Sequence, residues 1–148
     1  MHSAAEAEIA RTVELANLAG VRVLAVDDDA DALQMAQDAL EVAGAIVFAT
    51  SDAEEALAIL DREACDVALL DIGMPHLDGY ELLSRIRGRS RTGAEAIPAI
   101  ALTAYAQSAD RSRSLKAGFQ LHLTKPVQPT ELSAAVASLV QGRRDGPM

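Results

Sequence analysis

The chain has 148 residues, the length of one ordinary domain, and half of them are apolar, so a hydrophobic core is expected. Its 22 acidic and 13 basic residues give a net charge of −9, and no basic run with interleaved aromatic residues offsets it, so direct binding to nucleic acid is not expected. The sequence has no apolar run that could cross a membrane, no signal peptide pattern and a single cysteine, Cys65, interpreted as an inert packed thiol, so we expect a cytoplasmic protein.

The first segment, residues 1–19, is interpreted as an N-terminal extension. Ser3 and Glu6 have the spacing of a capping box, and an apolar stripe follows them, which predicts an additional helix over roughly residues 4–18. The sequence leaves open whether this helix caps the domain, pairs with a partner or ends a linker from a larger protein.

Residues 20–141 are expected to form the domain, and residues 142–148 a disordered tail. Short aliphatic runs alternate with helical periodicity about five times. The predicted strands are residues 21–26, 45–49, 67–70, 97–102 and 119–123. The predicted helices lie between and after them: one capped by Asp29 or Asp31 and ended by Gly44, one opened by a capping box of Ser51 and Glu54, two over 79–87 and 107–117, and a last one opened by Pro129.

The predicted strands lack alternating polarity, which is typical of strands that are buried on both faces. A parallel sheet between two layers of helices buries its strands in this way, so we expect a three-layer, doubly wound α/β domain. In such domains the ligand site lies beyond the carboxyl ends of the strands.

Polar residues follow four of the predicted strands, at the edge where this site is expected. Asp27, Asp28 and Asp29 follow the first strand, Asp71 the third, Thr103 the fourth, and Lys125 and Pro126 the fifth. Two carboxylates about 4 Å apart repel by roughly 4 kcal/mol at an effective dielectric near 20, so the cluster needs a proton or a bound cation. Oxygen ligands at a partly open site suit Mg²⁺ (or Mn²⁺), and Lys125 supplies a further positive charge.

Asp71 is the best candidate for a nucleophile, because it stands alone at the end of the predicted central strand. A carboxylate can attack phosphorus and form an aspartyl phosphate, and this transfer depends mainly on positioning and charge neutralisation. Asp27 and Asp28 are better interpreted as residues that hold the metal.

Four motifs resemble the signature of response-regulator receiver domains, and the resemblance covers about residues 21–140. They are VDDD at 26–29, LDIGMP at 70–75 with Asp78 and Gly79, LTA at 102–104 and TKP at 124–126. The segments 18–24 and 118–127 look like receivers attached to hybrid sensor kinases. The resemblance implies a flavodoxin-like receiver fold whose five parallel strands have the order 2-1-3-4-5.

The resemblance also implies roles for the residues at the strand ends. Asp71 would accept the phosphoryl group. Mg²⁺ would be bound by the carboxylates of Asp28 and Asp71 and the backbone carbonyl of Gly73, with Asp27 acting mainly through a bound water. Lys125 would contact the phosphoryl oxygens.

Other positions of the motifs would form a switch and shape the site. Thr103 would move to hydrogen-bond the phosphate, and His122 stands where the family has a rotating switch aromatic, more commonly Phe or Tyr. Pro75 and Gly79 would shape the loop beside the acceptor, and Pro126 stands where the family often has a cis bond.

The function that follows is a phosphate-operated binding switch, not an enzyme with turnover. The phosphoryl donor would be a histidine kinase or a histidine phosphotransfer protein. Two alternatives remain: a receiver-like scaffold that is never phosphorylated, and an aspartyl-phosphate hydrolase of the haloacid-dehalogenase kind. The hydrolase is disfavoured because its nucleophile follows the first strand, and a dinucleotide site because no glycine fingerprint follows that strand. The sequence leaves the cognate kinase, the downstream protein effector and the formation of a homodimer open.

Overall fold

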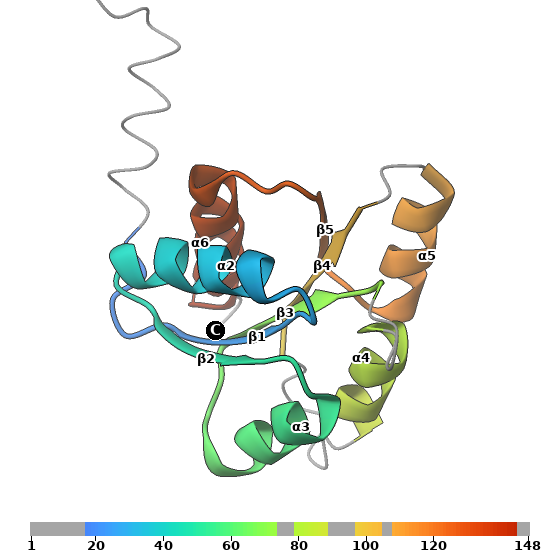
Figure 1. The fold of residues 1–148 in the computed structure, drawn as a ribbon, viewed down its shortest axis with the longest axis horizontal. Coiled ribbons are helices and arrows are strands. Elements are labelled where there is room, and N and C mark those ends of the chain that lie inside the picture. Colours follow the sequence, from blue (N-terminus) through green and yellow to red (C-terminus); the bar gives the residue numbers. More distant parts are fainter. Residues whose placement is uncertain (1–16, 74–78, 89–96, 105–107, 145–148) are drawn as a thin grey trace, which may run out of the picture.

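The computed structural model describes residues 17–73, 79–88, 97–104 and 108–144, in which five strands alternate with five helices (Figure 1). The elements are β1 (Arg22–Val26), α2 (Ala30–Val42), β2 (Ile46–Thr50), α3 (Ala53–Arg62), β3 (Val67–Asp71), α4 (Gly79–Gly88), β4 (Ala99–Thr103), α5 (Ser108–Ala117), β5 (Leu121–Thr124) and α6 (Pro129–Arg144).

The five strands form one all-parallel sheet with the order β2-β1-β3-β4-β5, which confirms the predicted architecture. The register pairs Val26 with Thr50 and Leu70, and Thr103 with Thr124. The carboxyl ends of the strands therefore meet at a common edge, and the loops that follow them lie side by side there.

Two cores, one on each face of the sheet, take up alternate residues of the central strands. One core joins the sheet to α2 and α6 and includes Val23, Ala25, Leu69, Ile100, Leu40 and Val136. The other joins it to α3 and α4 and includes Leu24, Val26, Leu70, Ala101, Leu57 and Leu82. Figure 1 shows α5 beside α4, at the β5 side of the sheet. β3 and β4 are apolar on both faces up to their last residues because both faces are covered by helices.

The packed domain begins at Leu18. The helix expected over residues 4–18 falls largely on residues 1–16, which lie outside the described residues. Leu18 is buried, and its N–H donates to the carbonyl of Ala43 at 2.8 Å. Gly44 follows α2 with a φ of +105°, and a Cβ there would lie 3.0 Å from the backbone nitrogen of Ala19. This close approach explains the glycine that ends α2.

The prediction that Ser51 caps the helix and forms a capping box with Glu54 is wrong, because the cap lies one residue later. Asp52 caps α3, and its carboxylate accepts the N–H of Glu54 at 3.2 Å. β2 continues through Thr50, whose hydroxyl accepts the N–H of Asp52. Because pairing with β1 keeps the chain extended through Thr50, Ser51 only connects the strand to the cap.

Other boundaries differ from the expected ones by a few residues. β5 begins at Leu121 because Phe119 turns into the core beside Tyr80, where the two rings meet edge to face with centroids 5.9 Å apart. α6 runs to Arg144, three residues beyond the expected end of the domain at 141.

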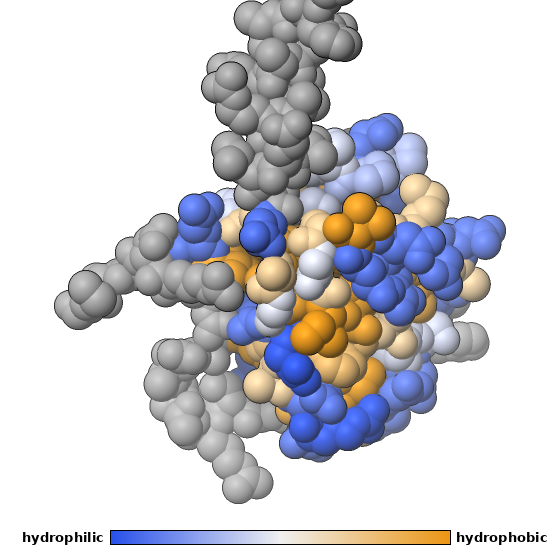
Figure 2. All heavy atoms as spheres, turned by 90° about the vertical axis from the view of Figure 1, so that its left-hand side faces the viewer, coloured by the Kyte–Doolittle hydropathy of each residue, from blue (hydrophilic) through white to orange (hydrophobic). Residues whose placement is uncertain are grey.

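The surface opposite the carboxyl ends of the strands mixes polar and apolar side chains. Figure 2 looks onto the side of Figure 1 where α2 ends and β2 begins, and apolar side chains gather in the middle of this face within a hydrophilic rim. Val42 and Ile46 are exposed there. Among the described residues, no helix combines the length and apolar character that crossing a membrane requires.

Candidate functional site

Three carboxylates from two strand ends converge at the carboxyl edge of the sheet. Asp27 and Asp28 follow β1, and Asp71 is the last residue of β3. Each of the three offers a carboxylate oxygen, and these oxygens lie within 4.8 Å of one another. The structure thus brings together the acidic residues that the sequence places after the first and third strands.

Asp27 is the most constrained of the three. Its side chain is buried, and its Oδ1 accepts the N–H of Asp29 at 2.9 Å. Its Oδ2 is buried without a hydrogen bond among the described residues and forms an ion pair, at 2.7 Å, with the ammonium of Lys125. Burial raises the pKa of Asp27, the carboxylate of Asp71 adds to this effect, and Lys125 and the Asp29 N–H only partly offset it.

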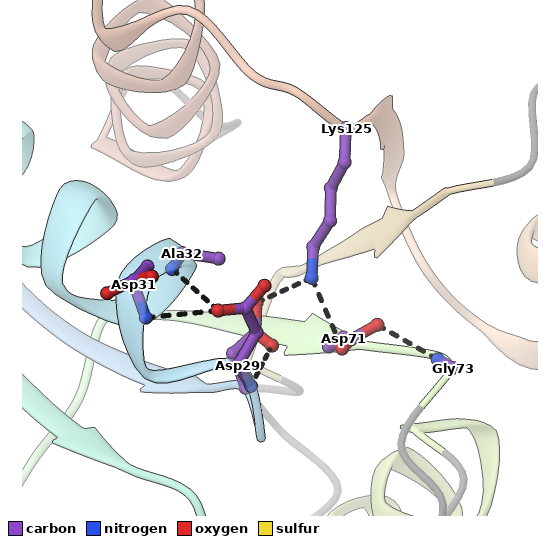
Figure 3. Close-up of polar contacts among 7 residues, drawn as sticks. Asp29, Asp31, Ala32, Asp71, Gly73 and Lys125 are labelled. Atoms are coloured by element: carbon purple, nitrogen blue, oxygen red, sulfur yellow. Dashed lines mark hydrogen bonds and ion pairs between the residues drawn. The ribbon is translucent and has the colours of Figure 1, made fainter.

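Asp71 is held on both of its carboxylate oxygens. Oδ1 accepts the N–H of Gly73 at 2.9 Å, and Oδ2 lies 3.3 Å from the ammonium of Lys125 (Figure 3). The side chain is 8% exposed, so it is buried in its surroundings but still reaches the surface of the site.

Lys125 reaches the two carboxylates from the end of β5 (Figure 3). Its backbone N–H donates to the carbonyl of Thr103 at 2.7 Å, and the bond to Pro126 is cis, as the resemblance implies. Burial alone would lower the pKa of Lys125, but the contacts with Asp27 and Asp71 outweigh burial and raise it. The side chain is therefore a fixed positive charge at neutral pH.

The start of α2 orders the loop that carries the acidic residues. Asp29 is the N-cap, and its carboxylate accepts the N–H groups of Asp31 and Ala32 at 3.0 and 3.2 Å (Figure 3). Its own N–H orients Asp27, so cap and site are parts of one turn. Asp28, between them, is exposed.

The two residues of the expected switch lie on adjacent strands. Thr103 is buried at the end of β4, and His122 is half-buried in β5. The register pairs Ala101 with His122 and Thr103 with Thr124, so all four side chains share one face of the sheet. Pro75 and Asp78 lie outside the described residues.

A groove of about 360 Å³ adjoins the carboxylates, between α2 and the segment that joins β5 to α6. Lys125 and Asp27 lie at its polar end, and the rest of its wall is mainly apolar. This groove was not predicted from the sequence. The alanines at positions 32, 36 and 39 of α2 were a signal for it, because small side chains on one helix face leave room beside a neighbouring helix.

The donor set fits a hard divalent cation. When all three carboxylates are ionised, the single ammonium leaves two negative charges uncompensated among the described residues. The exposed Asp28 leaves one side of the cluster open to solvent. Oxygen ligands with room for water are the surroundings that Mg²⁺ prefers.

The comparison with protein families and curated proteins gives a consistent result. A family model described as the response regulator receiver domain matches residues 23–137. A 14.6 kDa protein of Leptolyngbya boryana, described as uncharacterized, is 46% identical over 115 residues, which are 78% of this chain and 86% of its own length. The probable transcriptional regulator ycf27 of Guillardia theta is 38% identical over 120 residues, 81% of this chain but 45% of the regulator. Hybrid signal transduction histidine kinase D of Dictyostelium discoideum is 35% identical over 130 residues, 84% of this chain and 8% of the kinase.

Solved structures agree with this comparison. A CheY-like receiver domain protein from Methanospirillum hungatei JF-1 has a TM-score of 0.73 and 32% identity, covering 86% of this chain and 100% of its own. The receiver domain of the Francisella response regulator 1452 has a TM-score of 0.75 and 31% identity, covering 84% of this chain and 99% of its own. The likeness therefore extends over the whole sheet and its helices.

Proposed function

This chain belongs to the response regulator receiver domain family, and on that premise we propose that Asp71 is its phosphoacceptor. Receiver domains act in two-component signalling, where they pair with histidine kinases or phosphotransfer proteins. The proposed donor is a phosphohistidine of such a partner, and a phosphorelay of this kind operates in the cytoplasm.

One observation carries this proposal: the carboxylate of Asp71 lies beside both the ammonium of Lys125 and two further acidic groups. Lys125 Nζ is 3.3 Å from Asp71 Oδ2, and the carboxylate oxygens of Asp27 and Asp28 lie within the 4.8 Å cluster. A structural ion pair needs one carboxylate for one ammonium. Here three carboxylates surround one ammonium, and the excess negative charge beside Asp71 can bind the metal that assists a phosphoryl transfer.

In the proposed transfer, a carboxylate oxygen of Asp71 forms a bond to phosphorus. The bond from phosphorus to the imidazole nitrogen of the donor breaks, and its electron pair remains on that nitrogen. The Gly73 N–H holds the orientation of the Asp71 carboxylate, and Lys125 neutralises charge on the phosphoryl oxygens.

The metal would be held by the carboxylates of Asp28 and Asp71 and the backbone carbonyl of Gly73, with Asp27 acting through a bound water. Once bound, Mg²⁺ supplies positive charge that offsets the carboxylates and the phosphoryl group. Asp27 is oriented for this role by the Asp29 N–H, which occupies Oδ1 and leaves Oδ2 toward the site.

The output we propose is a change in protein–protein contacts rather than catalytic turnover. Phosphorylation replaces the single negative charge of the ionised Asp71 carboxylate with the nearly two negative charges of a phosphoryl group at the end of β3. The Thr103 hydroxyl would bond the new oxygens, and His122, on the same face of the neighbouring strand, would respond to the space that Thr103 vacates. A two-state element made of β4, α5 and β5 would then be biased.

Intact-mass spectrometry after incubation with acetyl phosphate and Mg²⁺ tests the acceptor. Wild-type protein is expected to gain the mass of one phosphoryl group, and Asp71→Asn, which keeps the shape of the side chain, is expected to gain none. Glu41→Gln is the matched control, because Glu41 is an exposed acidic residue near the far end of α2. A wild-type protein that is neither labelled nor altered by beryllofluoride in NMR spectra would favour the scaffold alternative.

A further inference from the structure

The groove beside the acceptor has an acidic wall that the proposed transfer does not use. Asp29 and Asp31 are both exposed and line the groove together with Asp27 and Lys125. Figure 3 shows Asp29 and Asp31 at the start of α2, beside Asp71 and Lys125. At the inner end of the same groove, the buried Asp27 Oδ2 is paired with the ammonium of Lys125 at 2.7 Å. The part of the groove at the start of α2 therefore carries charge of the same sign as a phosphoryl group, and it shares the groove with Lys125, whose ammonium lies 3.3 Å from Asp71 Oδ2.

The carboxylate of Asp29 has a structural task, whereas the helix cap does not need the carboxylate of Asp31. Asp29 accepts two backbone N–H groups as the cap of α2. Asp31 takes part in this cap through its backbone N–H, which any residue other than proline at this position could donate. The negative charge at position 31 is thus separable from the fold of the loop.

We propose that Asp31 is a specificity-determining residue that disfavours small dianionic phosphodonors and favours donors with positive charge next to their phosphoryl group. This inference rests on the proposed function of Asp71. A small acyl phosphate that approaches Lys125 and Asp71 brings two negative charges near Asp31, and no positive charge on such a donor offsets the repulsion. A protein donor with a basic side chain near its phosphohistidine cancels that repulsion, because its positive charge meets the acidic wall as the phosphoryl group enters.

Two small donors that differ in charge provide the test. Acetyl phosphate is dianionic, and its transfer breaks a P–O bond and releases acetate. Phosphoramidate carries a proton on its nitrogen that offsets part of its charge, and its transfer breaks a P–N bond and releases ammonia. The rate at which each labels Asp71 is measured in saturating Mg²⁺ for wild type, Asp31→Asn and Asp31→Lys.

Asp31→Asn is expected to increase the rate with acetyl phosphate about two- to fivefold at low salt, and the rate with phosphoramidate by a smaller factor. Asp31→Lys is expected to change the ratio of the two rates further in the same direction. Both gains should shrink as salt is raised, because exposed charges are screened. A loss of helix stability at position 31 would not change the ratio of the two donors.

Glu41→Gln serves as the matched control, since it removes the same charge from the same helix ten residues further on, about 15 Å along the axis, where its interaction with a donor at Asp71 is weaker. An equal gain in Glu41→Gln, equal gains with both donors, or an unchanged ratio in Asp31→Lys would overturn the role of Asp31 while leaving Asp71 as the acceptor. Failure of both donors to label the wild type would instead overturn the proposed function, and the inference with it.

Discussion

Gly79 and Asp71 lie in direct backbone contact, so that α4 begins directly against the end of β3. A Cβ at position 79 would lie 2.5 Å from the carbonyl oxygen of Asp71 and 2.9 Å from Cα of Ile72. These neighbours are backbone atoms, which cannot rotate away as a side chain would. Position 79 therefore requires glycine, because there is no room for a Cβ.

Gly79→Ala is expected to destabilise the domain by about 1–3 kcal/mol, because the added methyl group forces the end of β3 and the start of α4 apart. Chemical denaturation measures this loss. Gly88→Ala is the control within the same helix, since a Cβ there meets nothing within 4 Å, and it should be neutral or slightly stabilising. Equal effects of the two substitutions would contradict the steric explanation.

Asp28→Asn should separate metal binding from folding. Asp28 is exposed and belongs to the acidic cluster, so removing its charge relieves repulsion and should leave the metal-free protein as stable as the wild type or more so. The affinity for Mg²⁺ should fall about tenfold or more, because a carboxylate ligand is lost. A titration of the melting temperature with Mg²⁺, repeated after addition of a chelator, measures both effects. If Mg²⁺ stabilises wild type and Asp28→Asn equally, Asp28 is not a ligand.

Cys65 is expected to remain an unreactive thiol in the folded protein. Burial raises its pKa to about 11, with Asp66 and Glu63 adding to the effect and Arg22 opposing it. Near neutral pH its alkylation should be about a hundredfold slower than that of an unperturbed thiol, because the thiolate is the reactive form. Denaturant should restore the ordinary rate, and a fast reaction in the native state would contradict the assignment.

The raised pKa of Cys65 also determines how the free energy of unfolding changes with pH. The native state holds the proton more tightly than the unfolded state, whose thiol has its ordinary pKa of 9.0, so this contribution to stability is complete below pH 9. It is lost as the pH rises from 9 toward 11. The difference in unfolding free energy between wild type and Cys65→Ser should therefore decrease over this range.

The fold and the convergence of the acidic residues could be predicted because both follow from local patterns. Aliphatic runs without polar alternation indicate a parallel sheet, Asp27 and Asp71 each directly follow such a run, and Lys125 directly follows the last strand. A parallel sheet then brings these residues to one edge, independently of the conformation of the loops. The functional roles of Asp71, Thr103 and His122 remain predictions of the motifs and of the family.

Features that depend on contacts between distant segments could not be predicted. The shift of the cap from Ser51 to Asp52 depends on how far β2 pairs with β1. Phe119 has the residue type of a strand, but its contact with Tyr80 takes it into the core before β5 begins. The groove beside α2 and the contact of Gly79 with Asp71 arise only when helices are placed on the sheet.

The direction of α2 and α6 decides where the domain can be tethered. Both helices start at the edge that carries Asp71, and α6, with 16 residues, leads the chain about 24 Å away from it. Leu18, bonded to the carbonyl of Ala43, enters the domain at the far end of α2. The described part of the chain thus begins and ends at the pole opposite Asp71, and a fluorophore attached near either of these two points would leave the edge with the carboxylates uncovered.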